Sequence, residues 1–173
     1  HCSLGVHMQA DYVFAQQALA SAGADAKLSE RLTQDSLYML ILHEIGHTLG
    51  LTHNMRASQL QPDVFDVQAV EAGGLSGSVM DHEAVNVAPD GKPQTWFYQT
   101  RPGPSDAWAL QYGYGEYTEA ELQSVLARSA ETELVYGNDA DDMRRSSNGI
   151  DPHINIYDLS GDAIGYAEMR LTH

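Results

Sequence analysis

The order of apolar and polar residues predicts two consecutive helices in the first third of the chain. Residues 9–21 bring together side chains available for packing: Tyr12, Val13, Ala15, Leu19 and Ala20. Residues 26–50 form the longest helical pattern, with apolar residues at Leu28, Leu32, Leu37, Leu40, Ile41, Ile45 and Leu49. Gly50 ends this pattern, and glycine adopts a positive φ without a Cβ clash. We therefore expect the chain to leave the second helix sharply at Gly50.

The rest of the chain contains more turn residues. Residues 83–104 hold four prolines and two glycines, which predicts mostly loop with an extended piece at 96–98. A helix is predicted that Ser105 caps and Gly113 ends. A Thr-x-x-Glu capping box predicts a further helix over about 118–130. The pattern as a whole favours a helix-rich chain with an irregular middle.

The composition indicates one acidic domain. The chain has 173 residues, near the usual size of a single domain, and a formal net charge of −15. Because such a surface repels phosphate groups, we expect no nucleic-acid partner. The longest apolar run, residues 37–42, is too short to cross a bilayer, so we expect no membrane span. Cys2 is the only cysteine, which excludes an internal disulfide and zinc sites that need two or more thiolates.

The strongest chemical signal lies at the end of the long predicted helix. Residues 43–53 match the pattern HExxHxxGxxH. On a helix, His43 and His47 are separated by about 40° around the axis and about 6 Å along it, so both imidazoles can bind one metal ion. A turn at Gly50 can return His53 to the same ion as a third ligand. The motif therefore predicts a three-histidine metal site.

Glu44 is the candidate catalytic residue of this site. It lies about 100° from His43 around the helix, which keeps its carboxylate out of the ligand line and near the open side of the metal. Three imidazoles with a fourth position for water are typical of a catalytic zinc site, whereas four protein ligands close a structural one. Zinc lowers the pKa of its water to about 7, and a neighbouring carboxylate can take the proton. We therefore predict one Zn²⁺ per chain and hydrolysis with Glu44 as general base.

The segment HEIGHTLGLTH resembles the zinc signature of the metzincin metalloproteases. Together with Ser78-Val79-Met80-Asp81 and residues 103–114, it is similar to the Met-zincin catalytic domain of large bacterial zinc-dependent metalloproteases, over roughly residues 37–115. The resemblance implies a peptide or protein substrate and cleavage of peptide bonds. It also implies export to the periplasm, the cell surface or the exterior.

The resemblance singles out two residues beyond the histidine motif. Metzincins carry a methionine turn under the metal, and Met80 follows His53 by 27 residues. The alternative for Met80 is a plain core methionine. Relatives often have a tyrosine two residues after this methionine, where the present chain has His82. His82 could bind zinc, donate a hydrogen bond or face the solvent.

The resemblance implies an α+β fold of the zincin type, helix-rich in this chain. Metzincins build a substrate-binding sheet before the active-site helix, but only about 25 residues precede it here, too few for five strands and their connections. We therefore expect the sheet to be missing or truncated and the chain to be part of a longer protein. Within one domain over 1–173, we expect an active-site helix and zinc-binding turn at 26–53, the methionine turn at 75–82 and a C-terminal helical subdomain at 104–173.

Other candidate ligands show no metal-binding spacing. Four residues carry oxygen atoms of the kind that Ca²⁺ binds: Asn138, Asp139, Asp141 and Asp142. Because they lack the spacing of a calcium loop, we favour a solvated acidic loop, with Ca²⁺ binding as the alternative. Three further histidines are expected at the surface or in the tail: His7, His153 and His173.

Among the functions that fit this sequence, we favour a zinc-dependent endopeptidase. One alternative is a module that holds zinc, is catalytically silent and binds a partner, but such a module has no chemical need for Glu44. Another is a zinc hydrolase acting on a non-peptide amide, because the metal site determines the reaction and the cleft determines the substrate. The acidic composition favours cationic or neutral peptides as substrates.

Overall fold

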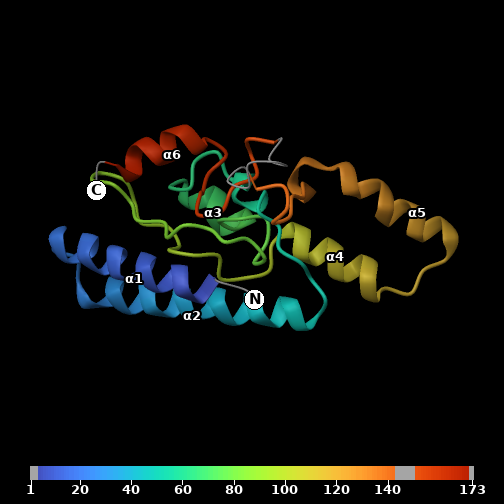
Figure 1. Cartoon of the computed structure of the whole chain (residues 1–173), viewed down its shortest axis with the longest axis horizontal. Helices are drawn as coiled ribbons and strands as arrows, with labels where there is room; N and C mark the ends of the chain where they lie inside the picture. Colours follow the sequence, from blue (N-terminus) through green and yellow to red (C-terminus); the bar gives the residue numbers. More distant parts are fainter. Residues whose placement is uncertain (1–3, 143–150, 172–173) are drawn as a thin grey trace.

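The structure is a computed structural model that describes residues 4–142 and 151–171. The described elements are α1 (Leu4–Ser21), α2 (Ala26–Thr48), η1 (Ala57–Leu60), α3 (Val67–Gly73), α4 (Pro104–Tyr114), α5 (Glu119–Ala127), η2 (Arg128–Ala130), η3 (Thr132–Leu134) and α6 (Ala163–Arg170). Helices α1 and α2 form an antiparallel pair, with α3 and α6 across an irregular stretch of chain (Figure 1). Helices α4 and α5 extend to one side. None of the described helices has the length and apolarity needed to span a membrane.

The helix predictions for the first third of the chain are confirmed. Helix α2 begins after Asp25, whose side chain accepts a hydrogen bond from the Leu28 backbone N–H at 3.0 Å, as an N-cap does. It ends at Thr48, and Gly50 has a φ of +86°. The left-handed turn predicted at Gly50 is therefore present. Helix α1 begins at Leu4, earlier than the pattern predicts.

The expected α+β class is wrong, since residues 4–142 and 151–171 contain no β-strand. Residues ahead of α2 form α1, and the expected extended piece at 96–98 is buried but irregular. In a sheet, the buried N–H groups would bond to a neighbouring strand. Here carboxylates take that place: Asp35 on α2 accepts from the Phe97 N–H at 2.8 Å, and Asp11 on α1 accepts from the Val85 N–H at 2.9 Å.

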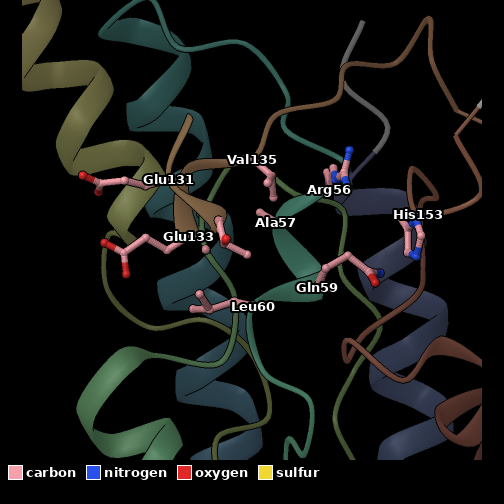
Figure 2. Close-up of a pocket in the computed structure, with 10 residues that line it drawn as sticks. Arg56, Ala57, Gln59, Leu60, Glu131, Glu133, Val135 and His153 are labelled. Carbon is pink, nitrogen blue, oxygen red and sulfur yellow. The ribbon is translucent and has the colours of Figure 1, made fainter. Parts of the chain in front are cut away.

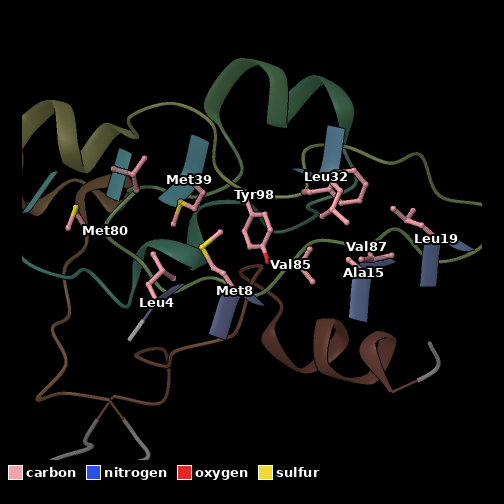
Figure 3. Packing of buried hydrophobic residues seen from close by; sticks show 12 residues of the cluster. Leu4, Met8, Ala15, Leu19, Leu32, Met39, Met80, Val85, Val87 and Tyr98 are labelled. Atoms are coloured by element: carbon pink, nitrogen blue, oxygen red, sulfur yellow. The ribbon is translucent and has the colours of Figure 1, made fainter. Parts of the chain in front are cut away.

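Two hydrophobic clusters lie on either side of the irregular segment between α3 and α4, residues 74–103. The first, against α1 and α2, contains Leu4, Met8, Ala15, Leu19, Leu32, Met39, Val79, Met80, Val85, Val87, Phe97 and Tyr98, with Met80 at one end (Figure 3). The second, near α3 and α6, contains Val64, Val70, Leu75, Ala84, Trp96, Leu159 and Tyr166. Neighbouring residues such as Ala84 and Val85 belong to different clusters. The irregular segment is therefore the middle layer of the fold.

One side of α2 is exposed to solvent. The exposed apolar side chains of this helix and its C-cap are Leu37, Tyr38, Ile41, Ile45 and Leu49. Leu32, Met39 and His43 lie on the buried side of the same helix. The apolar spacing that predicts α2 thus covers both a packed and an exposed side, and the first histidine of the motif faces the core.

Asp158 makes the stability of this fold depend on pH. Its carboxylate accepts hydrogen bonds from Ser58 Oγ at 2.8 Å and Gln59 Nε2 at 3.2 Å. Burial, with a smaller effect of the Asp142 carboxylate, raises the pKa of Asp158 to about 6, against 3.8 for the free side chain. Because the folded state holds this proton more tightly than the unfolded chain, the resulting stabilisation is present below about pH 4 and is lost as the pH rises through about 6.

We therefore expect Asp158→Asn, which cannot ionise, to gain stability relative to the wild type as the pH rises. The difference in unfolding free energy between the two proteins should change by about 2–3 kcal/mol from pH 4 to pH 7, at about 1.4 kcal/mol per pKa unit. Urea unfolding of both proteins at the two pH values measures this difference. A difference that stays constant with pH would contradict the raised pKa.

Candidate metal centre

Three of the predicted ligands converge at the C-terminal end of α2. His43 and His47 come from the last two turns of the helix, and His53 follows the turn at Gly50. Each offers one ring nitrogen, and the three nitrogens lie within 4.8 Å of one another. His43 is buried and the other two are partly buried. This cluster is compatible with zinc binding.

The second ring nitrogen of each histidine is hydrogen-bonded to an oxygen that can only accept. His43 Nδ1 lies 2.8 Å from the Val79 carbonyl oxygen, and His47 Nδ1 lies 3.1 Å from that of Leu51. His53 Nδ1 lies 2.9 and 3.0 Å from the two carboxylate oxygens of Asp139. Each Nδ1 therefore donates, so in the neutral form of each ring it is Nε2 that offers a lone pair to a metal ion.

These lone pairs face one another across a short distance. The Nε2 atoms of His47 and His53 are 3.1 Å apart. Ligands at the 2.0–2.1 Å bond length of zinc are about 3.3–3.4 Å apart in a tetrahedron, which is close to this separation. Burial lowers the pKa of His43 to about 4, so this imidazole stays neutral at ordinary pH. The donor set thus fits a zinc ion.

Glu44 lies between the first two ligands on the exposed side of α2. Its neighbour Ile45 is 46% exposed, whereas His43 on the other side of Glu44 is fully buried. The Glu44 side chain itself is exposed. Its carboxylate is thereby open to water and to an incoming molecule.

Met80 packs against α2 between the first two ligands. A Cβ atom at Gly46 would overlap the Met80 sulfur, so the glycine inside the motif permits this close approach. The Met80 carbonyl oxygen also accepts a hydrogen bond from the Asn54 N–H at 3.0 Å, directly after the third ligand. Met80 is 1% exposed and belongs to the first hydrophobic cluster. It is therefore both a core residue and the contact below the ligand-bearing turn of α2.

Two buried carboxylates hold the methionine turn. Asp106, in the first turn of α4, accepts hydrogen bonds from the Ser78 hydroxyl and from the Val79 N–H, the latter at 2.8 Å. Asp81 accepts from the His82 N–H at 2.7 Å. Burial raises the pKa of both carboxyls, and these hydrogen bonds oppose the increase. The sequence pattern places Asp106 in a helix start but does not indicate this contact with the methionine turn.

The segment near residue 139 belongs to the site without a signal in the sequence. The Asn54 side chain donates to the Val135 carbonyl oxygen at 3.0 Å and accepts from the Gly137 N–H at 3.1 Å, which holds this segment beside the third ligand. Asp139 then reaches His53. Asp142 is 1% exposed, so the expected acidic loop is not uniformly solvated. A carboxylate 86 residues from its histidine has no spacing signal that could identify it.

We expect Asp139→Ala to weaken zinc binding by about tenfold. A carboxylate that accepts from a ligand histidine orients the ring and increases its basicity, and its loss typically costs 10–100-fold in metal affinity. Because the Asp139 side chain is 51% exposed, we expect the low end of that range. Competition with a chromophoric chelator measures the zinc Kd. Asp90→Ala, on another loop, is the control for the loss of one negative charge, and equal Kd values for the two variants would contradict the orienting role.

His82 also lies at the histidine cluster. It is 3% exposed, which excludes the predicted alternative in which it faces the solvent. Its Nε2 is 3.3 Å from that of His53. Of the other histidines, His7 lies beside Tyr157 with ring centroids 4.2 Å apart, and His153 is exposed. Cys2 and His173 lie outside the described residues.

Two pockets in the described part of the chain lie at different places relative to the histidine cluster. One of about 540 Å³, with Arg56 and His153 on its wall, contains none of the clustered histidines (Figure 2). Another, of about 260 Å³, is lined by residues that follow α2, by the methionine turn and by α4, with Met80 on its wall. Of these two pockets, the smaller one is therefore next to the histidine cluster, because Met80 and the residues around His53 line it.

The comparison with known families agrees with the resemblance to metzincins. The sequence model of the Met-zincin family matches residues 25–173, a range that begins at the N-cap of α2 and includes the three histidines and the methionine turn. No curated protein and no solved structure matches the chain. Because the family match covers most of the chain, the predicted relationship is confirmed. The chain belongs to the Met-zincin family.

Proposed function

We propose that the chain is a zinc-dependent endopeptidase. The observation that carries this proposal is the cluster of three histidines with ligand nitrogens within 4.8 Å of one another, in which each Nδ1 is held by an acceptor oxygen. Such a set is held in place before the ion arrives. In a member of the Met-zincin family, this arrangement supports a metalloprotease site.

His43, His47 and His53 would hold the ion. When bound, zinc supplies Lewis-acid polarisation of a carbonyl group and lowers the pKa of water. Glu44 accepts the proton of the water molecule that attacks the peptide carbonyl, and then delivers it to the amine nitrogen as the C–N bond breaks. The exposed position of Glu44 on α2 suits this exchange, because both the water and the leaving amine come from the solvent side.

The remaining residues of the site position these groups. Gly50 allows the reversal that returns His53 to the cluster, through its φ of +86°. Met80 supports the helix at Gly46, between the ligands. The net charge of −15 favours cationic or neutral peptides as substrates, because an acidic surface attracts the former and repels anionic ones.

A mixed peptide library, analysed by mass spectrometry, tests this function. We expect the zinc-loaded protein to cleave peptides, a chelator to abolish cleavage and added zinc to restore it. The protein without added peptide and the library without protein are the controls. Cleavage that persists in the chelator would contradict a metal mechanism. A protein that binds one zinc ion per chain and cleaves no peptide would overturn the endopeptidase in favour of a silent zinc module.

A further inference from the structure

We propose that Asp106 is a positioning residue for the first metal ligand, His43, an inference that rests on the zinc site proposed above. Asp106 lies in the first turn of α4 and is 3% exposed. It acts through the backbone of Val79, whose carbonyl oxygen accepts a hydrogen bond from His43 Nδ1 at 2.8 Å. The peptide groups on both sides of Val79 are tied to the Asp106 carboxylate, one directly and one through a serine.

The peptide group before Val79 is held by the carboxylate itself. Asp106 Oδ2 accepts from the Val79 N–H and from the Gly103 N–H, both at 2.8 Å. Gly103 is the N-cap of α4, so the second bond ties the carboxylate to the start of its own helix. A Cβ atom at Gly103 would overlap the Gly77 backbone, which shows how closely α4 approaches the methionine turn. The Val79 N–H is therefore fixed relative to α4.

The peptide group after Val79 is held through Ser78. The Ser78 hydroxyl donates to Asp106 Oδ1 and accepts from the Met80 N–H at 2.9 Å. The Met80 N–H and the Val79 carbonyl belong to one planar trans peptide group, in which they point in opposite directions. The contact that holds the Met80 N–H thus aims the Val79 carbonyl oxygen the other way, toward His43.

The orientation of His43 depends on this carbonyl oxygen. The His43 ring is fully buried, so water does not compete for its Nδ1 proton. The acceptor of that proton determines that Nε2 faces the other ligands, and it also determines the rotation of the ring. His47 and His53 have other acceptors for their Nδ1 protons, on residues 51 and 139. Asp106 therefore acts on the first ligand and not on the other two.

Zinc Kd values from chelator competition, with unfolding free energies from urea titration, test the proposal. Because Asp106 acts through Val79, we expect Asp106→Ala to raise the Kd by about tenfold, the low end of the range for groups that orient a ligand. Asp106→Asn keeps a neutral acceptor oxygen for the Val79 N–H, so its Kd should lie between those of the wild type and Asp106→Ala. Asp35→Ala is the matched control, since Asp35 is also buried and accepts from the Phe97 N–H at 2.8 Å. It should lose stability but keep the wild-type Kd.

Ser78→Ala tests the contact with the second peptide group. We expect it to raise the zinc Kd as well, because the Met80 N–H loses its acceptor. Ser58→Ala is the control, since Ser58 is equally buried and donates to the Asp158 carboxylate at 2.8 Å, outside the histidine cluster. In the metal-free protein, the Nδ1 proton of His43, followed by NMR, should exchange with water faster in Ser78→Ala and Asp106→Ala than in the wild type.

The outcomes separate this inference from the function on which it rests. Wild-type Kd values in Asp106→Ala and Ser78→Ala would overturn the role of Asp106 and leave the three-histidine site intact. An equal increase of the Kd in Asp35→Ala would also overturn it, in favour of a general loss of stability. A wild type that binds no zinc would overturn the zinc site, whereas the proton exchange of His43 needs no metal. If Asp106→Ala fails to fold, Asp106→Asn and Ser78→Ala decide.

Discussion

Replacing Glu44 with glutamine is expected to reduce peptide hydrolysis by about 10²–10⁴-fold while zinc content stays at about one ion per chain. Glutamine keeps the size and the hydrogen-bonding oxygen of the side chain but cannot accept the proton of the attacking water. The metal ligands come from His43, His47 and His53, so their Nδ1 contacts are unchanged. Rates on the best peptide of the library, with metal content from the same preparation, measure the effect.

Glu30→Gln is the control for this change. Glu30 is exposed on the same helix, and its carboxylate accepts a hydrogen bond from Gln34 Nε2 at 3.4 Å, far from the ligand-bearing turns. The control removes the same charge from α2 and should keep the wild-type rate. Undiminished turnover in Glu44→Gln would refute the general-base role. Loss of zinc from that variant would instead show that Glu44 takes part in metal binding.

The local parts of the site can be predicted because one helix carries them. His43 and His47 share a face by helical geometry, and the φ of +86° at Gly50 agrees with the role that a glycine there predicts. The place of Met80 under the helix follows from the family resemblance, and the contact at Gly46 shows how closely the Met80 sulfur approaches α2. The pairing of the first two histidines and the turn at Gly50 follow from short sequence spacings. The position of Met80 follows from the family's motif.

The long-range parts of the site could not be predicted in the same way. Asp139 reaches His53 from a segment that Asn54 contacts at residues 135 and 137, and no sequence periodicity links these positions to the histidine motif. Asp106 illustrates the same limit. Its place in the first turn of α4 is predictable from capping, but its hydrogen bonds to the methionine turn depend on how α4 is placed in three dimensions.

The class of the fold was mispredicted for a related reason. A family resemblance implies a sheet, and buried apolar segments such as residues 96–98 agree with one. The sequence does not show that carboxylates on α1 and α2, Asp11 and Asp35, accept hydrogen bonds from two backbone N–H groups of the middle layer. Helical spacing also cannot distinguish the buried from the exposed side of α2, where Ile41 is 55% exposed.

Truncating His53 to alanine is expected to remove zinc from the protein. Structural zinc sites bind with roughly 10–16 kcal/mol over four ligands, or about 3 kcal/mol for each, so the loss of one ligand weakens binding by about 10²-fold or more. His53 also links the cluster to Asp139, and the variant loses this orienting contact as well. Metal content by plasma mass spectrometry, after purification without added zinc, should fall from about one ion per chain to near zero.

His153→Ala is the matched control, because this histidine is exposed and bonds to Asp151 through Nδ1 at 3.0 Å, outside the cluster. It should keep the zinc content of the wild type. Full occupancy and an unchanged Kd in His53→Ala would contradict the three-histidine site, since α2 by itself supplies only two ligands.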